Sequence, residues 1–259
     1  MICRLLSILG RAYPIRRGRW TLSRHCRNWC RGAAVARLRC GAQMLVDRAN
    51  AVDRVIYLFG EYDREEMEWL LSKVRDARQT LLYDIGANIG AYSVILPTMV
   101  PGLTAHAFEP DTRNLTFLRA NIAINGLEEQ VTIRDVAVGD QAGTVQFLES
   151  RGGDLLNTGK SKVVNDPDNL ASLRTVTKIA VDDLDPVRGK TVLMKIDVEG
   201  YEFDVLQGMR RTLRDNACYL MIEIFPENLV KCDGLMEELG YRRTISFGSD
   251  DWAYEPTGV

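Results

Sequence analysis

Histidine is scarce in this chain, with only His25 and His106 among 259 residues. His25 lies in an arginine-rich N-terminal segment. His106 falls inside an expected strand, where it should share a side with Phe108 and pack against a helix. A histidine base is therefore not expected, and proton transfer should fall to carboxylates. No carboxylate is accompanied by a metal-ligating histidine, so we predict no metal site, with Mg²⁺ held by carboxylates as the alternative.

Long apolar runs are also missing. No segment approaches the roughly 18–20 residues that a membrane-spanning helix needs. Met1 to Gly10 contains a short apolar stretch without a clear cleavage site, so no secretory signal is expected. The hydrophobic content of 46% and the charged content of 26% are typical of a globular protein. The length fits one α/β domain with appendages.

Acidic residues are absent from the first 46 positions, which contain ten arginines. Since the net charge is −2, the rest of the chain is acidic. A basic arm of this kind is attracted to phosphate in nucleic acid or in anionic lipid, and the interleaved aliphatic residues with Trp20 and Trp29 favour a membrane-surface helix. We therefore predict peripheral contact of residues 1–40 with an anionic membrane. The alternatives are a disordered tail or residues upstream of the true start codon.

No nucleic-acid partner is expected, and the predicted location is cytoplasmic, with or without membrane association. Six cysteines are present, four of them in the arm. Their spacing does not repeat as paired zinc knuckles, and His25-Cys26 with Cys30 lacks a second matched pair. Free thiols in a reducing cytoplasm are the default expectation.

Alternating strands and helices follow the arm. A cap segment at residues 41–78, with a helix at 61–74, precedes a domain at residues 79–259. This alternation predicts an α/β fold, doubly wound around a mainly parallel seven-stranded Rossmann-like sheet, with an N-terminal helical cap extension. The expected strands are 80–84, 103–108, 131–135, 191–196 and 219–225, with two more in 242–254. The expected helices are 89–96, 111–125, 201–214 and 229–239, and 152–171 is expected to be a mobile loop between strands.

The segment Asp84-x-Gly86-x-Asn88-x-Gly90 connects the first strand to a helix. Its glycines allow a tight turn and a close approach of the backbone to a ligand. A dinucleotide fold has glycine at the first position, because the pyrophosphate contacts backbone N–H groups at the helix N-terminus. Asp84 would repel a pyrophosphate but would suit the ammonium group of a methionine moiety. The loop therefore favours S-adenosyl-L-methionine over NAD.

Acidic side chains end the neighbouring strands, at the sheet edge where ligands of such folds bind. Glu109 lies 19 residues after Gly90 and is placed to accept both ribose hydroxyls. Asp135 ends the third strand and is placed to accept from the adenine amino group. Asp197 and Glu223 end the next two strands of the sheet.

Three segments carry a resemblance to a known family. Tyr83 to Ser93 resembles motif I of the FkbM-type methyltransferases, as do Phe108-Glu109-Pro110 with Asn114 and, most specifically, Leu193 to Glu202. The resemblance runs from about residue 41 to 241. It implies a class I fold and methyl transfer from S-adenosyl-L-methionine, usually to oxygen, on acceptors that include sugars and natural products. The candidate cofactor-binding residues are then Asp84, Gly86, Asn88, Gly90, Glu109, Pro110, Asp135 and Asp197.

The methyl of a sulfonium is already activated, so the protein has to align an acceptor and manage one proton. We expect Asp197 to line the methyl-transfer site, and Glu199 or Glu223 to orient or deprotonate a small-molecule or glycan acceptor. A helix-capping role is the alternative for Glu199. Lys195 should lie on the same side as Asp197 and pair with it, or extend into solvent. Residues 151–171, the first helix and the tail should enclose the acceptor.

Two other functions fit parts of the pattern. An NAD(P)-dependent Rossmann oxidoreductase would use the same kind of loop, and Asp84 argues against it. A non-catalytic, membrane-associated binding module would use the basic arm. The intact glycine loop and the intact segment at residues 193–202 argue against that reading.

Overall fold

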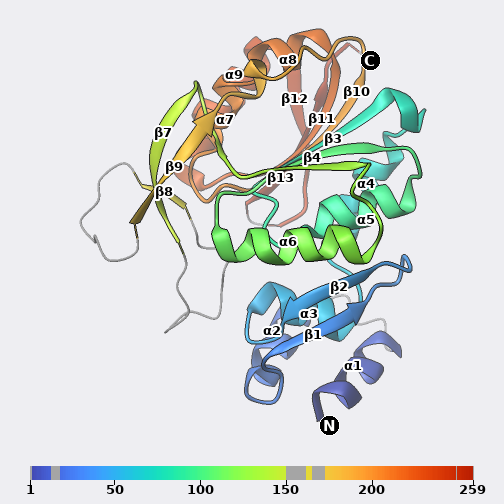
Figure 1. The fold of residues 1–259 in the computed structure, drawn as a ribbon. Coiled ribbons are helices and arrows are strands. Elements are labelled where there is room, and N and C mark those ends of the chain that lie inside the picture. The colour runs from blue at the N-terminus through green and yellow to red at the C-terminus, as the bar shows by residue number, and fades with distance from the viewer. Residues whose placement is uncertain (1, 13–17, 150–161, 165–172, 249, 259) are drawn as a thin grey trace.

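A mainly parallel sheet forms the centre of the structure (Figure 1). The computed structural model describes residues 2–12, 18–149, 162–164, 173–248 and 250–258. The seven strands of the sheet lie in the order β12-β13-β11-β10-β3-β4-β5. Only β13 and β12 interrupt the parallel pairing, since β13 runs antiparallel to both β11 and β12. The predicted doubly wound α/β fold is confirmed.

The elements of this domain agree with the expected ranges to within a few residues. The strands are β3 (Thr80–Ile85), β4 (Thr104–Phe108), β5 (Val131–Arg134), β10 (Thr191–Ile196), β11 (Ala217–Glu223), β12 (Tyr241–Ser246) and β13 (Asp251–Pro256). The helices are α4 (Arg64–Ser72), α5 (Ala91–Met99), α6 (Thr112–Ile124), α7 (Glu202–Gln207), α8 (Arg210–Asp215) and α9 (Pro226–Glu238).

Alternation along β3 explains the two layers of helices. Leu82 faces one side of the sheet and packs in a core with residues of α5 and α6. Leu81, Tyr83 and Ile85 face the other side and pack in a core with residues of α7, α8 and α9. All six residues of β3 are buried, as expected for a central parallel strand covered on both faces. Figure 1 shows the two helical layers on opposite sides of the sheet.

Two helices differ from the prediction. The single helix expected at residues 201–214 is divided into α7 and α8, and Gly208, which lies between them, is close to Gly139. A Cβ at Gly208 would come within 1.9 Å of the Gly139 carbonyl oxygen. The helix expected at residues 89–96 continues to Met99 as α5, with Pro97 inside it. Neither difference moves these helices away from the sheet that they cover.

A smaller sheet lies beside the carboxyl ends of the main strands. It contains β6 (Ala137–Val138), β7 (Gly143–Leu148), β8 (Lys162–Val164) and β9 (Leu173–Ile179), in the order β6-β9-β7-β8. Glu149 after β7 connects it to the start of α6. The Glu149 carboxylate lies 3.1 Å from Arg174 Nε and accepts from Thr112 Oγ1 at 3.0 Å. Of the expected loop at 152–171, only residues 162–164 are described, and they form β8.

The N-terminal segment is folded over its described residues. It contains α1 (Ile2–Ala12), α2 (Arg19–His25), the antiparallel hairpin of β1 (Ala33–Arg37) and β2 (Gln43–Asp47), and α3 (Ala51–Phe59). The predicted boundary at residue 40 falls inside this hairpin, and a disordered tail is the wrong description of residues 2–12 and 18–40. Asn121 of α6 accepts from Leu45 N at 2.6 Å and so connects β2 to the sheet domain. Among the described helices, none combines the length and apolar character needed to cross a bilayer.

Cys3 and Cys30 form a disulfide, so the expectation of free thiols is wrong for this pair. Cys26, Cys40, Cys218 and Cys232 are free. Disulfides persist mainly in oxidising compartments, and the cytoplasmic location therefore stays a prediction.

Replacing Cys3 with Ser should destabilise the N-terminal segment. The bond closes a segment with a sequence separation of 27. The loss of this cross-link should lower the free energy of unfolding by about 3 kcal/mol. Urea unfolding followed by tryptophan fluorescence would report it, with Cys40→Ser as the control at a free thiol. Equal midpoints for the oxidised and reduced protein would contradict this stabilisation.

Candidate active site

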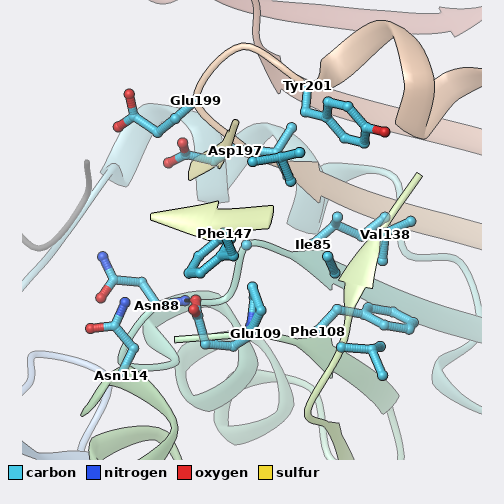
Figure 2. Close-up of a pocket in the computed structure, with 16 residues that line it drawn as sticks. Ile85, Asn88, Phe108, Glu109, Asn114, Val138, Phe147, Asp197, Glu199 and Tyr201 are labelled. Carbon is cyan, nitrogen blue, oxygen red and sulfur yellow. Dashed lines mark hydrogen bonds between the residues drawn. The ribbon is translucent and has the colours of Figure 1, made fainter. Parts of the chain in front are cut away.

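A cavity lies where β3, β4 and β10 end and the smaller sheet begins (Figure 2). The main-sheet strands place their following loops along one wall, and β6, β7 and β8 supply apolar side chains along another. The strand order reverses between β3 and β10, which is where ligands of doubly wound sheets bind. The lining residues are Ile85, Gly86, Asn88, Phe108, Glu109, Pro110, Asn114, Val136, Ala137, Val138, Phe147, Val163, Asp197, Val198, Glu199 and Tyr201.

Gly86 brings the glycine loop against the end of β10. Its φ is +79°, and a Cβ there would lie 1.8 Å from the Asp197 carbonyl oxygen. Gly90 has a φ of +88°, and a Cβ there would lie 2.5 Å from Leu118 Cδ1 of α6. Gly86 therefore shapes the cavity wall, whereas Gly90 permits α5 and α6 to pack closely.

Gly86→Ala should destabilise the protein more than Gly126→Ala. Both positions have a positive φ, but a Cβ at Gly126 has no atom within 4 Å among the described residues. Gly126→Ala should therefore cost about 1 kcal/mol of backbone strain, and Gly86→Ala should cost several times more because Asp197 must also move. Chemical denaturation of the two variants measures the difference. Equal costs would mean that the loop does not touch β10.

Asp84 does not line the cavity. Its carboxylate is buried beneath the start of α5, where Oδ2 accepts from Ser93 N at 3.0 Å and from Ser93 Oγ at 2.6 Å. Burial raises the pKa of Asp84 to about 6. This position gives Asp84 a role in fixing the helix, and the contact with a ligand ammonium group stays a prediction.

Glu109 occupies the predicted place beside the glycine loop. One carboxylate oxygen accepts from Asn88 N at 2.7 Å, and the other accepts from Asp111 N at 2.8 Å. The side chain is 4% exposed and lines the cavity. Burial raises the pKa of Glu109 to about 8. The carboxyl group is thus held in a fixed orientation by two backbone donors and still faces the cavity.

Two amide oxygens near Glu109 have no partner within the described structure. They are Oδ1 of Asn88, which has a positive φ of 52°, and Oδ1 of Asn114 on α6. Both residues line the cavity, and Figure 2 shows their side chains beside Glu109. A buried amide oxygen without a donor costs about 1–3 kcal/mol, so this pair points to a polar ligand that donates hydrogen bonds.

The other predicted cofactor residues separate into two groups. Pro110 lines the cavity, and its carbonyl accepts from Arg174. Asp135 is exposed, and its Oδ2 lies 3.8 Å from Arg119 Nη2 on the surface. It is not among the residues that line the cavity. The expected contact of Asp135 with adenine therefore has no support from its position.

Asp197 and Glu199 lie on the loop between β10 and α7. Figure 2 shows both carboxylates on the side of the cavity to which the amides of Asn88 and Asn114 also point. Glu199 has a φ of 52°, a conformation that non-glycine residues rarely adopt. Asn228 Nδ2 donates to the following Gly200 carbonyl at 3.0 Å, which fixes the end of this loop.

A polar cluster built around the buried Lys195 adjoins Asp197 on the side of β11. Lys195 Nζ lies 3.9 Å from the Asp197 carboxylate and 3.4 Å from that of Asp251, and it stands 5.8 Å from the centre of the Tyr92 ring. Tyr92 donates to Asp63 Oδ2 at 3.2 Å. Burial alone would lower the pKa of Lys195, but the carboxylates around it outweigh burial and raise it. Lys195 is therefore a fixed cation. It pairs with Asp197, which is one of the two arrangements predicted for it.

Glu223 ends β11 within the same cluster. Burial, and then the neighbouring charge of Asp197, raise the pKa of Glu223 to about 9. Burial also raises the pKa of Asp63 to about 7. The cluster therefore holds carboxyl groups that can keep or release a proton near neutral pH. In the described ranges, no group of three or more His, Cys, Asp or Glu side chains is arranged to bind a metal ion.

Glu223→Gln should flatten the dependence of stability on pH. The folded protein holds the Glu223 proton up to a pH of about 9, whereas the unfolded chain releases it near 4.5. This contribution to stability is complete below pH 4.5 and is lost as pH rises through about 9. The urea midpoint of the parent protein should thus fall over this window more than that of the variant. If the urea midpoint falls equally with pH in the two proteins, Glu223 does not have the raised pKa. Glu227→Gln, on the exposed start of α9, is the control.

Comparison with known families identifies the chain. The protein-family model described as "Methyltransferase FkbM domain" matches residues 84–243, which include the glycine loop, Glu109 and the loop after β10. The chain belongs to the FkbM methyltransferase family. It is 32% identical over 112 residues to the 31-O-demethyl-FK506 methyltransferase FkbM of Streptomyces tacrolimicus. That match covers 43% of this chain and 37% of the relative.

The fold agrees with a solved member of the FkbM family. The crystal structure of methyltransferase FkbM from Methylobacillus flagellatus KT has a TM-score of 0.52 with this chain at 18% identity. The match covers 75% of this chain and 46% of that one. This chain therefore spans less than half the length of these two relatives. The likeness confirms the class I methyltransferase fold.

Several residues at this FkbM site were not predicted from the sequence. Asn114 was part of a motif, but no role followed from its place on a helix. Phe147 and Val163 come from the smaller sheet, far from the glycine loop in the chain. Asp63 and Asp251 join the cluster from the cap segment and from β13, and no local pattern marks either. His106 is not among the residues that line the cavity; its ring stacks on that of Phe108, and its ring centre lies 5.5 Å from that of Tyr83.

Proposed function

We propose that this chain is an S-adenosyl-L-methionine-dependent O-methyltransferase whose acceptor is a hydroxyl group on a sugar, a glycan or a natural-product-like small molecule. The observation that carries the proposal is the buried Glu109 carboxyl group, flanked by the unpaired amide oxygens of Asn88 and Asn114 in one cavity. Ribose hydroxyls and amino groups are donors that would satisfy these acceptors. The family match supports methyl transfer as the reaction.

The residues of the cavity fit the parts of this cofactor. Glu109 would accept from the ribose hydroxyls, with the Asn88 and Asn114 oxygens as further acceptors. The apolar side chains of Val138 and Phe147 offer a surface for adenine. Asp197 and Gly86 lie at the β10 side of the cavity, where the methionine portion would extend toward the polar cluster. S-adenosyl-L-methionine supplies an activated methyl group when bound.

The acceptor would approach beside Asp197, because this carboxylate borders both the cavity and the polar cluster. Asp197 would accept a hydrogen bond from the acceptor hydroxyl and thereby orient its oxygen toward the methyl group. Glu199 would assist in positioning the acceptor or in taking up its proton, and Glu223, which keeps its own proton up to a pH of about 9, would assist in positioning the acceptor or would take up the proton only at higher pH. Lys195 would hold Asp197 in place through its charge. The name of the Streptomyces tacrolimicus relative refers to 31-O-demethyl-FK506, which supports an oxygen acceptor.

Thermal unfolding with added ligands tests the cofactor. A ligand that binds the folded state at 100 times its Kd stabilises it by about 2.7 kcal/mol. S-adenosylhomocysteine and S-adenosylmethionine should therefore raise the Tm, while NAD should leave it unchanged. The proposal is falsified if NAD raises the Tm and neither adenosyl ligand does.

A further inference from the structure

The outward side of α1 is apolar, which is unusual for a helix on the surface of a folded unit. Its inward side is fixed by Cys3, Ser7 and Gly10, which are buried. Ser7 donates to the Tyr57 carbonyl at 2.9 Å, and a Cβ at Gly10 would lie 2.8 Å from the Leu58 carbonyl oxygen. This close contact with α3 sets the rotation of α1. The opposite side therefore carries four exposed aliphatic residues, Ile2, Leu5, Ile8 and Leu9, which are 53–58% exposed.

The apolar surface continues onto α2 and the turn after it. Leu9 and Leu22 line one groove, whose floor includes Leu58 and Phe59 of α3. Trp20 is 48% exposed and Trp29 is 59% exposed. The disulfide at Cys30 holds Trp29 near the start of α1. Figure 1 shows α1 at the end of the molecule away from the main sheet, so this surface is separate from the cavity.

The chain segment that carries this surface has charges of one sign only. No acidic residue occurs before Asp47. Some arginines are paired within the fold, since Arg19 and Arg39 pair with Glu61 and Arg54 donates to the Ser23 carbonyl at 2.8 Å. Others remain exposed on or next to α1 and α2, namely Arg4, Arg24, Arg27 and Arg31. Within the described residues, these four arginines make no ion pair or side-chain hydrogen bond, so the apolar face is accompanied by cations that this part of the fold does not use.

We propose that α1, α2 and the turn to Trp29 form a docking surface for an anionic lipid bilayer. Aliphatic side chains and tryptophans would enter the boundary between headgroups and acyl chains, and the arginines would contact lipid phosphates. A second copy of this chain is a poorer occupant, because two arginine-rich surfaces without acids repel each other. Nucleic acid would pair with the arginines but would leave the aliphatic face of α1 exposed.

Vesicle co-sedimentation of the full chain tests this surface. The protein should pellet with vesicles of equimolar phosphatidylglycerol and phosphatidylcholine, and stay in solution with phosphatidylcholine alone. The double variant Leu5→Gln, Ile8→Gln should bind the anionic vesicles at least about tenfold more weakly, because two aliphatic side chains are no longer buried in the bilayer. Arg24→Gln and Arg27→Gln should each lower the affinity for the anionic vesicles about fivefold. Val230→Gln, at a residue 83% exposed on α9, should change nothing.

Three results would overturn the proposal. They are the absence of binding to the anionic vesicles, binding that the Leu5→Gln, Ile8→Gln variant retains, and a dimer in light scattering that this variant dissociates. Tighter binding to a single-stranded oligonucleotide than to the vesicles would assign the surface to nucleic acid instead. The Tm shift with S-adenosylhomocysteine should be the same in all variants. Failure of the membrane proposal is thus distinguishable from failure of the proposed methyltransferase function.

Discussion

Replacing Glu109 with Ala should weaken binding of S-adenosylhomocysteine by about 100-fold or more, because two charge-assisted hydrogen bonds to the ribose are lost. Titration calorimetry measures the change in Kd. Glu129→Gln, at an exposed position after α6, is the control. Glu109 also accepts from Asn88 N and Asp111 N, so the Tm of the ligand-free variant must be measured beside the affinity. Unaltered binding by a folded Glu109→Ala protein would remove the ribose assignment.

The same carboxyl group predicts a pH dependence of binding. Since burial raises the pKa of Glu109 to about 8, the ligand-free protein carries a proton there at neutral pH. Acceptance from both ribose hydroxyls requires the carboxylate. Affinity for S-adenosylhomocysteine should therefore increase as pH rises through about 8, and Glu109→Gln should abolish this dependence. An affinity independent of pH in the parent protein would show that ribose binding does not use the charged form.

Asp197→Asn should lower kcat by about 100-fold to 10,000-fold while leaving the affinity for S-adenosylhomocysteine nearly unchanged. Asn keeps the size of the side chain but lacks the charge that strengthens the hydrogen bond from the acceptor hydroxyl and attracts Lys195, whose Nζ lies 3.9 Å away. Transfer of a labelled methyl group to a panel of sugars and hydroxylated natural products measures the rate.

Asp135→Asn is the matched control for Asp197→Asn, since Asp135 pairs with Arg119 on the surface. Glu199→Gln and Glu223→Gln, in the same assay, determine which carboxyl group assists Asp197. Unchanged kcat in Asp197→Asn would place the reacting oxygen elsewhere. A large loss of cofactor affinity in that variant would instead assign Asp197 to cofactor binding alone.

The sheet and the central loop were predictable because their signals are local. Buried strands such as residues 191–196 appear as apolar runs, and Gly86 is needed where the backbone of the loop contacts β10. Glu109 was predictable from its position after a strand, which fixes the edge of the sheet where it must lie. These inferences use only the chain direction and the alternation of strands and helices.

The position of Asp84 was not predictable from the same reasoning. A carboxylate at a strand end can point into the cavity or beneath the next helix, and Ser93 decides between them by donating two hydrogen bonds. The argument from Asp84 against a dinucleotide therefore has no geometric support, and the family match carries that distinction.

Long-range contacts account for the remaining differences. The polar cluster joins Asp63, Tyr92 and Asp251 to Lys195, and these residues come from α5, β10, β13 and the position just before α4. The fold of the N-terminal segment depends on a disulfide and on contacts with α3, which composition alone does not show. A charge count identified the basic segment but not which of its arginines face inward.

A crystal structure with S-adenosylhomocysteine tests the central claim most directly. We expect ribose hydroxyls within hydrogen-bond distance of the Glu109 carboxylate, with Asn88 or Asn114 oxygens accepting from the ligand and the sulfur directed toward Asp197. Adenosine bound elsewhere, with the two amide oxygens still unpaired, would contradict it.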